Sequence, residues 1–314
     1  DIVAIQETKA RPNQLGSNLL EPDGWQSFWN SAERPGYSGV AIYSKIKPLR
    51  IETEFKNPIL NAEGRIILAE FERFYFLNVY FPNGKASTAR LEYKLEFYEQ
   101  FLKLIEKLRK KKPIVFCGDV NTAHHEIDLA RPKANELISG FLPIERKWID
   151  KIIVRGYLDT FRLKHPNEAE KYSWWSQRTH ARERNVGWRI DYFFASEELK
   201  KNIVAAEILA DIKGSDHCPV SLNLKFGITS SLAPKLQPSL PKRSAKLPSS
   251  SQQGEVEELN SVAARYLFYN FLESDNFHKT CGIFPRVRVR KSGGYGSHNF
   301  LKSLRSNPVT RSFF

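Results

Sequence analysis

Short apolar segments rich in β-branched and aromatic residues recur along the first 226 residues, and polar side chains end most of them. Residues 114–117 are the clearest case, a continuous apolar run that is too short for a helix and typical of a strand buried on both faces. The same pattern predicts further strands at residues 2–5, 39–44, 66–71, 74–81, 172–175, 189–195, 203–209 and 220–226.

Two helices are predicted in the same region. Residues 90–112 carry apolar side chains at helical spacing and end in a basic run, and a second helix is expected around residues 144–155. Many strands with few helices between them favour a mixed, largely antiparallel sheet system with helices outside it. A doubly wound parallel sheet is not favoured.

The character of the chain changes after residue 226. Residues 230–253 are rich in Ser, Pro and Lys, which is typical of a disordered linker, and residues 255–274 could form one amphipathic helix. We therefore expect a folded domain over residues 1–226. Residues 227–314 would be a basic, largely disordered tail, or else an artefact without a coherent structural pattern.

Charge indicates the kind of partner. The net charge of +13 favours a polyanion, either nucleic acid or an acidic membrane surface. Residues 227–314 hold 13 Lys/Arg and 5 Asp/Glu, so +8 of this charge falls there and only +5 on residues 1–226. Charge alone therefore does not establish that the folded domain binds nucleic acid.

Other features of composition limit the class of protein. No apolar run is long enough to span a bilayer, and the three cysteines lie far apart, which favours a reduced, intracellular compartment. The chain begins inside an apolar run, at residues 2–5, and contains no Met. We infer from this that the natural N-terminus is missing.

Polar groups able to carry chemistry recur at the ends of the predicted strands. Asp119 and Asn121 follow residues 114–117, and period-2 alternation would point both to one side. Each such residue alone is also ordinary turn chemistry. Together they offer hard oxygen ligands suited to Mg²⁺ or Mn²⁺, beside a histidine for phosphate binding or acid–base catalysis. The set comprises Glu7, Asp119, Asn121, Asp191, Asp216 and His217.

Short motifs containing these residues follow one another along residues 1–226. They are Ile5-Gln6-Glu7-Thr8-Lys9, Glu63-Gly64-Arg65, Asn78-Val79-Tyr80-Phe81-Pro82-Asn83, Arg90-Leu91-Glu92-Tyr93-Lys94, Gly118-Asp119-Val120-Asn121, His125-Glu126-Ile127-Asp128-Leu129, Tyr172-Ser173-Trp174-Trp175, Gly187-Trp188-Arg189-Ile190-Asp191-Tyr192-Phe193 and Gly214-Ser215-Asp216-His217-Cys218-Pro219. In this order they resemble the exonuclease III family of abasic-site (AP) endonucleases. The resemblance implies the four-layered α/β sandwich of the endonuclease/exonuclease/phosphatase superfamily, with two mixed sheets face to face and helices outside. The family's first strand, which carries a site Asn, would be missing here.

The resemblance also implies roles for individual residues. Glu7 would hold the catalytic Mg²⁺, for which Mn²⁺ could substitute, and Asp216 would be a further metal ligand or an orienting acid. Asp119 would prepare the attacking water. Asn121 would orient that water or the phosphate.

The remaining implied roles concern the phosphate. His217, held by Asp191, would face a phosphate oxygen on which negative charge develops, an arrangement that stabilises the transition state. Tyr80 would lie at the scissile phosphate near the leaving oxygen. Asn83 and Asn135 would position the phosphate.

Substrate specificity is expected from residues 174–188, where three arginines lie between tryptophans. Cations for phosphates and aromatic rings for stacking are a nucleic-acid contact composition, although a solvated loop beside core tryptophans has the same composition. By resemblance, Trp174, Trp188 and Ile190 would line a pocket for a flipped, baseless sugar. Arg178 would insert into the duplex.

The sequence therefore predicts a Mg²⁺-dependent DNA repair phosphodiesterase that cuts 5′ to abasic sites, with possible 3′–5′ exonuclease and 3′-phosphodiesterase activity. Its partner would be double-stranded DNA with abasic sites or 3′-blocked ends. The expected protein is an intracellular monomer without a membrane association. Two alternatives stay open, a non-catalytic DNA-binding relative and a superfamily phosphatase acting on phospholipid or inositol phosphates.

Overall fold

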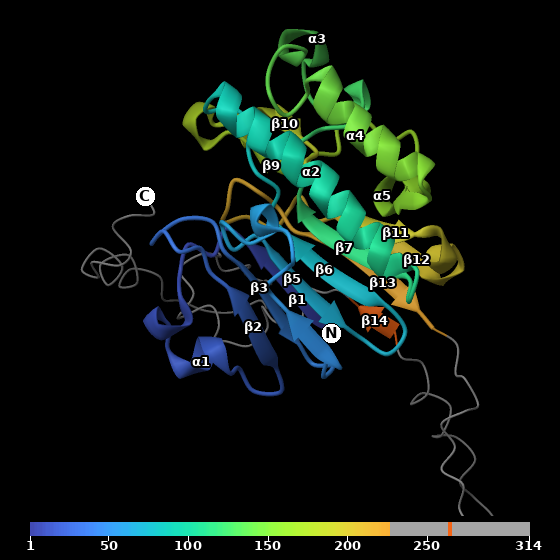
Figure 1. Ribbon diagram of the computed structural model, residues 1–314. Coiled ribbons are helices and arrows are strands. Elements are labelled where there is room, and N and C mark those ends of the chain that lie inside the picture. Colours follow the sequence, from blue (N-terminus) through green and yellow to red (C-terminus); the bar gives the residue numbers. More distant parts are fainter. Residues whose placement is uncertain (227–262, 266–314) are drawn as a thin grey trace, which may run out of the picture.

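The computed structural model describes residues 1–226 and 263–265, and its centre is a six-stranded mixed sheet (Figure 1). Only β6 and β7 in this sheet run parallel, and every other neighbouring pair is antiparallel. Its strands, in spatial order, are β4 (Arg50–Glu52), β5 (Ile66–Glu70), β6 (Tyr75–Val79), β7 (Ile114–Asp119), β11 (Asp191–Ser196) and β8 (Tyr157–Asp159).

A second layer of strands packs on one face of the central sheet. It consists of two three-stranded antiparallel sheets, and a short two-stranded ribbon lies apart from them. One sheet contains β1 (Ile2–Gln6), β3 (Val40–Ser44) and β2 (Gln26–Asn30), the other contains β12 (Ile203–Ile208), β13 (Val220–Lys225) and β14 (Ala263–Arg265), and the ribbon is β9 (Trp174–Trp175) with β10 (Gly187–Trp188).

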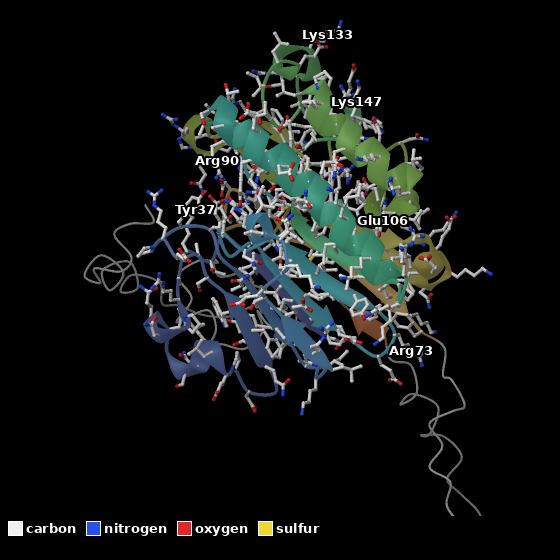
Figure 2. The ribbon with its side chains drawn as sticks, viewed as in Figure 1. Tyr37, Arg73, Arg90, Glu106, Lys133 and Lys147 are labelled. Atoms are coloured by element: carbon white, nitrogen blue, oxygen red, sulfur yellow. The ribbon has the colours of Figure 1, made fainter. Side chains whose placement is uncertain are left out.

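Helices form the outer layers. The long helix α2 (Thr88–Arg109) and α4 (Pro143–Val154) cover the other face of the central sheet, and α1 (Ser17–Leu20) lies outside β1–β3 (Figure 1). Charged side chains such as Lys133 and Lys147 project outward from α3 and α4 (Figure 2). The remaining helices are α3 (Pro132–Asn135), α5 (Thr160–Lys164), and the 3₁₀ helices η1 (Pro12–Gln14), η2 (Pro58–Leu60), η3 (Glu126–Asp128), η4 (Gln177–Thr179), η5 (Ala181–Arg184) and η6 (Glu197–Asn202).

Strand alternation divides the apolar side chains between two cores. In β7, Phe116 packs with α2 and α4, whereas Val115 and Cys117 pack between the two sheet layers. Both faces of β7 are therefore buried, as its uninterrupted apolar run predicts. The predicted four-layered α/β sandwich is confirmed.

The structure corrects two details of the sequence prediction. Strands β2, β4 and β8 are missing from the prediction because they are short or interrupted by polar residues, so they lack a clear apolar signal. The helix predicted over residues 255–274 is wrong at Ala263–Arg265, which pair with β13 as β14. A sheet edge offers unpaired backbone groups that can override helical periodicity. The rest of residues 227–314, including the predicted linker, lies outside the described residues.

In the described part of the chain, no helix combines the length and the apolar character needed to cross a bilayer. The longest helix, α2, has charged residues on its exposed face and buries the opposite face against the central sheet. Its length therefore serves packing on the sheet.

Candidate active site

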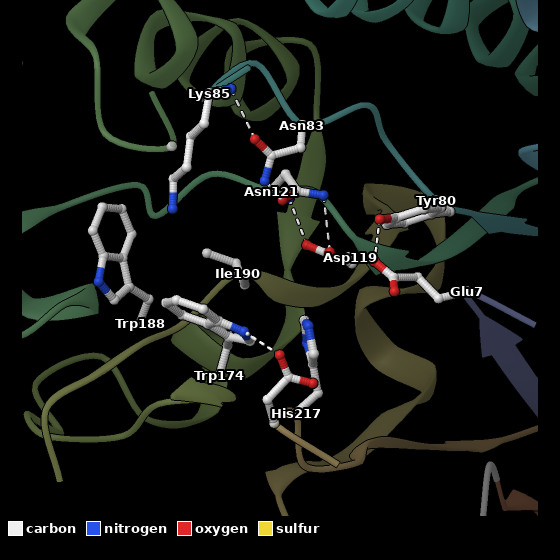
Figure 3. Close-up of a pocket in the computed structure, with 12 residues that line it drawn as sticks. Glu7, Tyr80, Asn83, Lys85, Asp119, Asn121, Trp174, Trp188, Ile190 and His217 are labelled. Atoms are coloured by element: carbon white, nitrogen blue, oxygen red, sulfur yellow. Dashed lines mark hydrogen bonds between the residues drawn. The ribbon is translucent and has the colours of Figure 1, made fainter. Parts of the chain in front are cut away.

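The candidate active site lies at one end of the central sheet, where β7 ends and β11 begins (Figure 3). Asp119 is the last residue of β7 and lies directly opposite Asp191, the first residue of β11. Both follow the alternation that points Val115, Cys117 and Phe193 between the two sheet layers. The backbone ladder therefore places two buried carboxylates side by side at the mouth of the inter-sheet space.

Gly118 allows the neighbouring strand β6 to contribute to the same site. Its φ is +139°, and a Cβ atom at this position would lie 1.9 Å from the carbonyl oxygen of Val79. Only glycine fits so close an approach. The segment after β6 consequently runs beside Asp119, whose carbonyl oxygen accepts a hydrogen bond of 2.9 Å from the Phe81 amide.

Asp191 holds His217 by a contact of 2.9 Å between its Oδ2 and the imidazole Nδ1. Burial alone would lower the pKa of His217, but the adjacent Asp191 carboxylate, helped by Asp119 and Asp216, raises it to about 10. The imidazole is therefore protonated at neutral pH. It presents a positive charge and its other N–H group to the cavity that it lines.

Asn121 fixes the carboxylate of Asp119. Its backbone amide donates to Asp119 Oδ1 at 2.7 Å and its side-chain Nδ2 donates to Oδ2 at 2.9 Å. Asn121 has φ +55°, so a left-handed turn, and not strand alternation, brings the two side chains together. The Oδ1 of Asn121 accepts a 2.8 Å hydrogen bond from Asn83 Nδ2, which extends the network to the segment after β6.

Glu7 and Tyr80 form the opposite wall of the cavity (Figure 3). The Tyr80 hydroxyl donates a hydrogen bond to Glu7 Oε1, and Lys9 Nζ lies 2.9 Å from Glu7 Oε2. Burial and the nearby Glu7 and Asp119 charges raise the pKa of Tyr80, so its hydroxyl keeps its proton. Buried Arg65 stacks on the Tyr80 ring at 4.5 Å and fixes its orientation.

The acidic half of the site is suited to a hard divalent cation. Glu7, Asp119 and Asp216 line one cavity, and Asp191 lies opposite Asp119 in the sheet and contacts His217. Burial first, and then repulsion from Asp191, raise the pKa of Asp119 to about 8. Carboxylate oxygens are the ligands that Mg²⁺ and Mn²⁺ take in proteins, and Mg²⁺ retains several waters. The residues present therefore fit such an ion.

The other half of the cavity is apolar and lies beside the carboxylates. Trp174, Trp188 and Ile190 line it together with Gly140, and the whole cavity encloses about 220 Å³. The two indole rings are nearly perpendicular, with centroids 6.5 Å apart. Trp174 Nε1 also donates to Asp216 Oδ2 at 2.9 Å. This hydrogen bond fixes the position of the apolar wall relative to the acidic wall.

Lys94 supports the site from the helical layer. It is fully buried, and its Nζ lies 2.6 Å from Glu145 Oε1. The same ammonium donates to the Asn121 carbonyl at 2.8 Å and to Thr122 Oγ1 at 2.9 Å. Glu145 Oε2 accepts from the Gly140 amide at 2.6 Å. One buried ion pair therefore holds the turn after β7 and the loop that closes the apolar half.

Ten of the thirteen site residues expected from the sequence line this cavity, and Asp191 lies behind His217. Arg178 is exposed on η4, and Asn135 uses its amide within α3, donating to the Arg131 carbonyl at 2.9 Å. Neither lines the cavity, so their roles in DNA binding stay predictions. The ten are Glu7, Tyr80, Asn83, Asp119, Asn121, Trp174, Trp188, Ile190, Asp216 and His217.

Two further arginines, Arg182 within residues 174–188 and Arg189 just beyond them, would also be candidates for phosphate contacts by composition, but both have other contacts. Arg189 is buried and forms ion pairs with Asp128 at 2.8 Å and Asp159 at 2.7 Å, so it is wrong as a DNA contact. Arg182 donates to three backbone carbonyls in residues 210–215. A stretch rich in Arg and Trp does not by itself distinguish solvent-facing arginines from buried ones.

Two cavity residues, Lys85 and Gly140, were not expected from the sequence. Both lie in irregular segments between secondary structure elements, where no periodicity predicts which way a side chain points. Lys85 follows the Asn83 turn, and its direction depends on the tertiary structure. No signal short of the fold itself could have identified it.

A separate group of possible metal ligands lies outside the cavity. It consists of His124, His125 and Asp150, whose ligand atoms lie within 4.8 Å of one another. His124 Nε2 is already 2.7 Å from Asp150 Oδ1, and its ring contacts that of His125. A buried histidine paired with a carboxylate explains this cluster without an ion.

Comparison with known proteins places this chain in a family. Residues 1–217 match the model of the Endonuclease/Exonuclease/phosphatase family. An exodeoxyribonuclease of Bacillus subtilis is 44% identical over 222 residues, covering 71% of this chain and 87% of that protein. The DNA repair nuclease APEX1 of Danio rerio is 38% identical over 226 residues, covering 71% and 73%.

Solved structures agree with the sequence comparison. The AP endonuclease of Archaeoglobus fulgidus superimposes with a TM-score of 0.64 at 30% identity, covering 70% of this chain and 87% of its own. The chain belongs to the Endonuclease/Exonuclease/phosphatase family, within its group of exodeoxyribonucleases and AP endonucleases. It is thus an enzyme, a phosphodiester hydrolase of a metal-dependent family.

Proposed function

We propose that this protein is a Mg²⁺-dependent nuclease that cuts the DNA backbone 5′ to abasic sites and leaves a 3′-hydroxyl. The observation that carries the proposal is that one cavity joins two halves. One half holds carboxylates suited to a divalent cation together with His217, and the other half is apolar. Removal of 3′-blocking groups and of 3′-terminal nucleotides would use the same centre. A relative named exodeoxyribonuclease supports the removal of terminal nucleotides, and one named DNA-(apurinic or apyrimidinic site) endonuclease supports cleavage at abasic sites.

Asp119 acts as the base that takes a proton from the attacking water. Asn121 holds both of its carboxylate oxygens in place, so the carboxylate needs no reorganisation when the water loses its proton. The pKa of Asp119 is raised by burial and by Asp191, so nearby positive charge is needed to keep it ionised at neutral pH. The imidazolium of His217 supplies part of that charge.

His217 also stabilises the transition state. Its N–H group and positive charge are directed into the cavity by the Asp191 hydrogen bond, beside the carboxylate of Asp119. Negative charge on the non-bridging phosphate oxygens grows as the water attacks, and a preorganised cation interacts more strongly with that state than with the substrate. Asn83 would donate to the same phosphate.

A divalent cation held by Glu7 and Asp216 would neutralise the phosphate and stabilise charge on the leaving oxygen. The Tyr80 hydroxyl, which keeps its proton, lies beside Glu7 and can donate to the leaving 3′-oxygen. Asp119 and Tyr80 would therefore serve the attacking and the leaving oxygen, as an in-line displacement requires.

Specificity follows from the apolar half of the cavity. Trp174, Trp188 and Ile190 give this half of the cavity a mainly apolar wall, which offers few partners for the polar edge of a base. A deoxyribose lacking a base would enter it, and such a nucleotide is also cheap to flip because no base is unstacked. The two indole rings would pack against the sugar.

The test uses the full-length chain and a duplex with one abasic site. We expect a nick 5′ to the site with Mg²⁺, no nick at this 5′ position with EDTA, and a loss of roughly 10²–10⁴-fold in kcat for Asp119→Asn. Lys147→Met, a change on the exposed face of α4, serves as the matched control. Absence of Mg²⁺-dependent nicking by the wild-type protein would contradict the proposal.

A further inference from the structure

Lys85 reaches from the turn after β6 into the apolar half of the cavity (Figure 3). Its Nζ lies 5.2 Å from the centroid of the Trp174 ring and 5.1 Å from that of Trp188. Its backbone amide donates to Asn83 Oδ1 at 2.8 Å, which fixes the start of the side chain. A primary amine is therefore held against the two rings proposed to receive the baseless sugar.

The Lys85 ammonium forms no ion pair with a carboxylate of residues 1–226. Within residues 1–226, the ion pairs that the structure forms do not include it, and Asp119 and Glu145 influence it only at longer range. The residue is exposed as a whole, but the end of its side chain lies against indole rings, and this partial burial lowers its pKa. The fraction of unprotonated, nucleophilic amine is therefore larger than for a lysine on the surface.

The mechanism proposed above makes no use of this amine. Catalysis at the phosphate employs Asp119, His217 and Tyr80, all in the acidic half of the cavity. A baseless deoxyribose, however, equilibrates between a closed hemiacetal and an open form with an aldehyde at C1′. Lysine amines react with such carbonyl groups to give Schiff bases. The cavity thus brings an electrophile and an unused nucleophile together.

We propose that Lys85 forms a covalent imine with the C1′ aldehyde of an abasic site, as a second, metal-independent reaction of this enzyme. The proposal rests on the proposed function, because it requires the abasic sugar to enter this cavity. The Lys85 nitrogen forms a bond to C1′, and the aldehyde oxygen leaves as water. No oxidant or reductant is needed.

The iminium makes strand cleavage on the 3′ side of the sugar possible. Loss of a C2′ proton to water supplies the electron pair for a C2′–C3′ double bond, and the C3′–O3′ bond breaks. The 3′-phosphate group leaves as the 5′-phosphate of the downstream strand. Water then hydrolyses the imine, which releases the unsaturated aldehyde and regenerates the amine of Lys85.

The experiment traps the imine by reduction. Full-length protein is mixed with an abasic-site duplex in EDTA, and sodium borohydride converts any imine into a stable protein–DNA adduct. We expect an adduct with wild-type protein, and tryptic mass spectrometry should locate it on the peptide containing Lys85. Lys85→Arg should lose the adduct, whereas Lys133→Arg, at an exposed lysine of α3 (Figure 2), should retain it.

Each outcome separates this proposal from the proposed function. Mg²⁺-dependent nicking by the wild-type protein without an adduct would overturn the imine and leave the nuclease intact. An adduct located only on other lysines would also overturn it. An adduct on Lys85 without Mg²⁺-dependent nicking would support the imine and contradict the nuclease. Circular dichroism of Lys85→Arg checks that loss of the adduct does not reflect unfolding.

Discussion

Asp119 is the residue on which the chemistry of the site depends most directly. It is almost completely buried, faces Asp191 across two paired strands, and has both carboxylate oxygens fixed by Asn121. Burial and the Asp191 charge hold its pKa above the ordinary carboxyl range, whereas the charge of His217 opposes them. The pKa of a base in this environment is expected to fall when a cation is added to the cavity.

The pH dependence of nicking tests this environment. Asp119 must be ionised to accept a proton, and its pKa is raised to about 8, so kcat/KM should increase as the pH rises through that value. A divalent cation favours the ionised carboxylate, so the rise should move to lower pH as the Mg²⁺ concentration increases. Measurements of kcat/KM between roughly pH 5 and pH 9 at several Mg²⁺ concentrations check both expectations.

Asp191→Asn provides the matched comparison for the pH profile. It removes the negative charge that raises the pKa of Asp119, so the rise should shift to lower pH. It also removes the carboxylate that holds His217 protonated, so the maximal rate should fall. A profile that is unchanged by Asp191→Asn would contradict the proposed coupling between the two carboxylates.

At the scale of elements, Arg182 joins the 3₁₀ helix η5 to the loop that carries Asp216 and His217. Its guanidinium donates to the carbonyls of Ser215 at 3.0 Å, Ala210 at 2.8 Å and Ile212 at 2.6 Å. It also stacks 4.5 Å from the centroid of the Trp175 ring. The N–H groups of this one guanidinium therefore hold the loop that carries Asp216 and His217 in position from outside the cavity.

Arg182→Gln should consequently lower kcat more than it raises KM. The shorter amide cannot reach three carbonyls, and a misplaced His217 would reduce the rate by roughly 10- to 100-fold. Arg178→Gln, at an exposed arginine of the neighbouring η4, should chiefly raise KM through lost phosphate contact. Steady-state kinetics of both variants, with an NMR titration of His217 in Arg182→Gln, distinguish the roles. A change in KM alone for Arg182→Gln would contradict positioning.

The buried pair of Lys94 and Glu145 connects helices α2 and α4 to the turn after β7. Lys94→Met would leave the Glu145 charge buried without its partner, so we expect a loss of about 3–5 kcal/mol in the free energy of unfolding. Urea denaturation checks this value. Lys103→Met, at an exposed position of the same helix, should change stability by less than about 0.5 kcal/mol. Equal stability of the two variants would show that the pair is dispensable.

Sequence pattern and structure agree best where periodicity and packing coincide. β7 and α2 are predicted because most of their apolar residues pack in one core or another, and Glu7, Asp119 and His217 are found because polar groups flank such strands. The turn at Asn121 and the direction of Lys85 could not be predicted. They depend on a left-handed backbone and on the tertiary packing of loops, for which a single sequence carries no periodic signal.

At the scale of the whole molecule, the site lies at one end of a sandwich and draws its residues from both sheet layers. Glu7 follows β1 in one layer, and Asp119 ends β7 in the other. The buried core between the sheets, which contains Val115 and Phe193, keeps the two layers at a fixed separation. The geometry of the cavity is therefore a property of the complete described domain and not of one loop.

Removal of residues 227–314 tests how far the domain depends on its tail. All residues of the cavity lie within residues 1–217, so kcat should be retained. The deletion removes +8 of the +13 net charge, so KM should rise at low salt and converge with the full-length value as salt screens the charge. It also removes β14, which leaves the edge of β13 unpaired, so a modest loss of thermal stability is expected. Nicking assays over a salt series and thermal unfolding measure these effects. A large loss of kcat, or a protein that no longer folds, would show that residues 227–314 are required for the structure of the active enzyme.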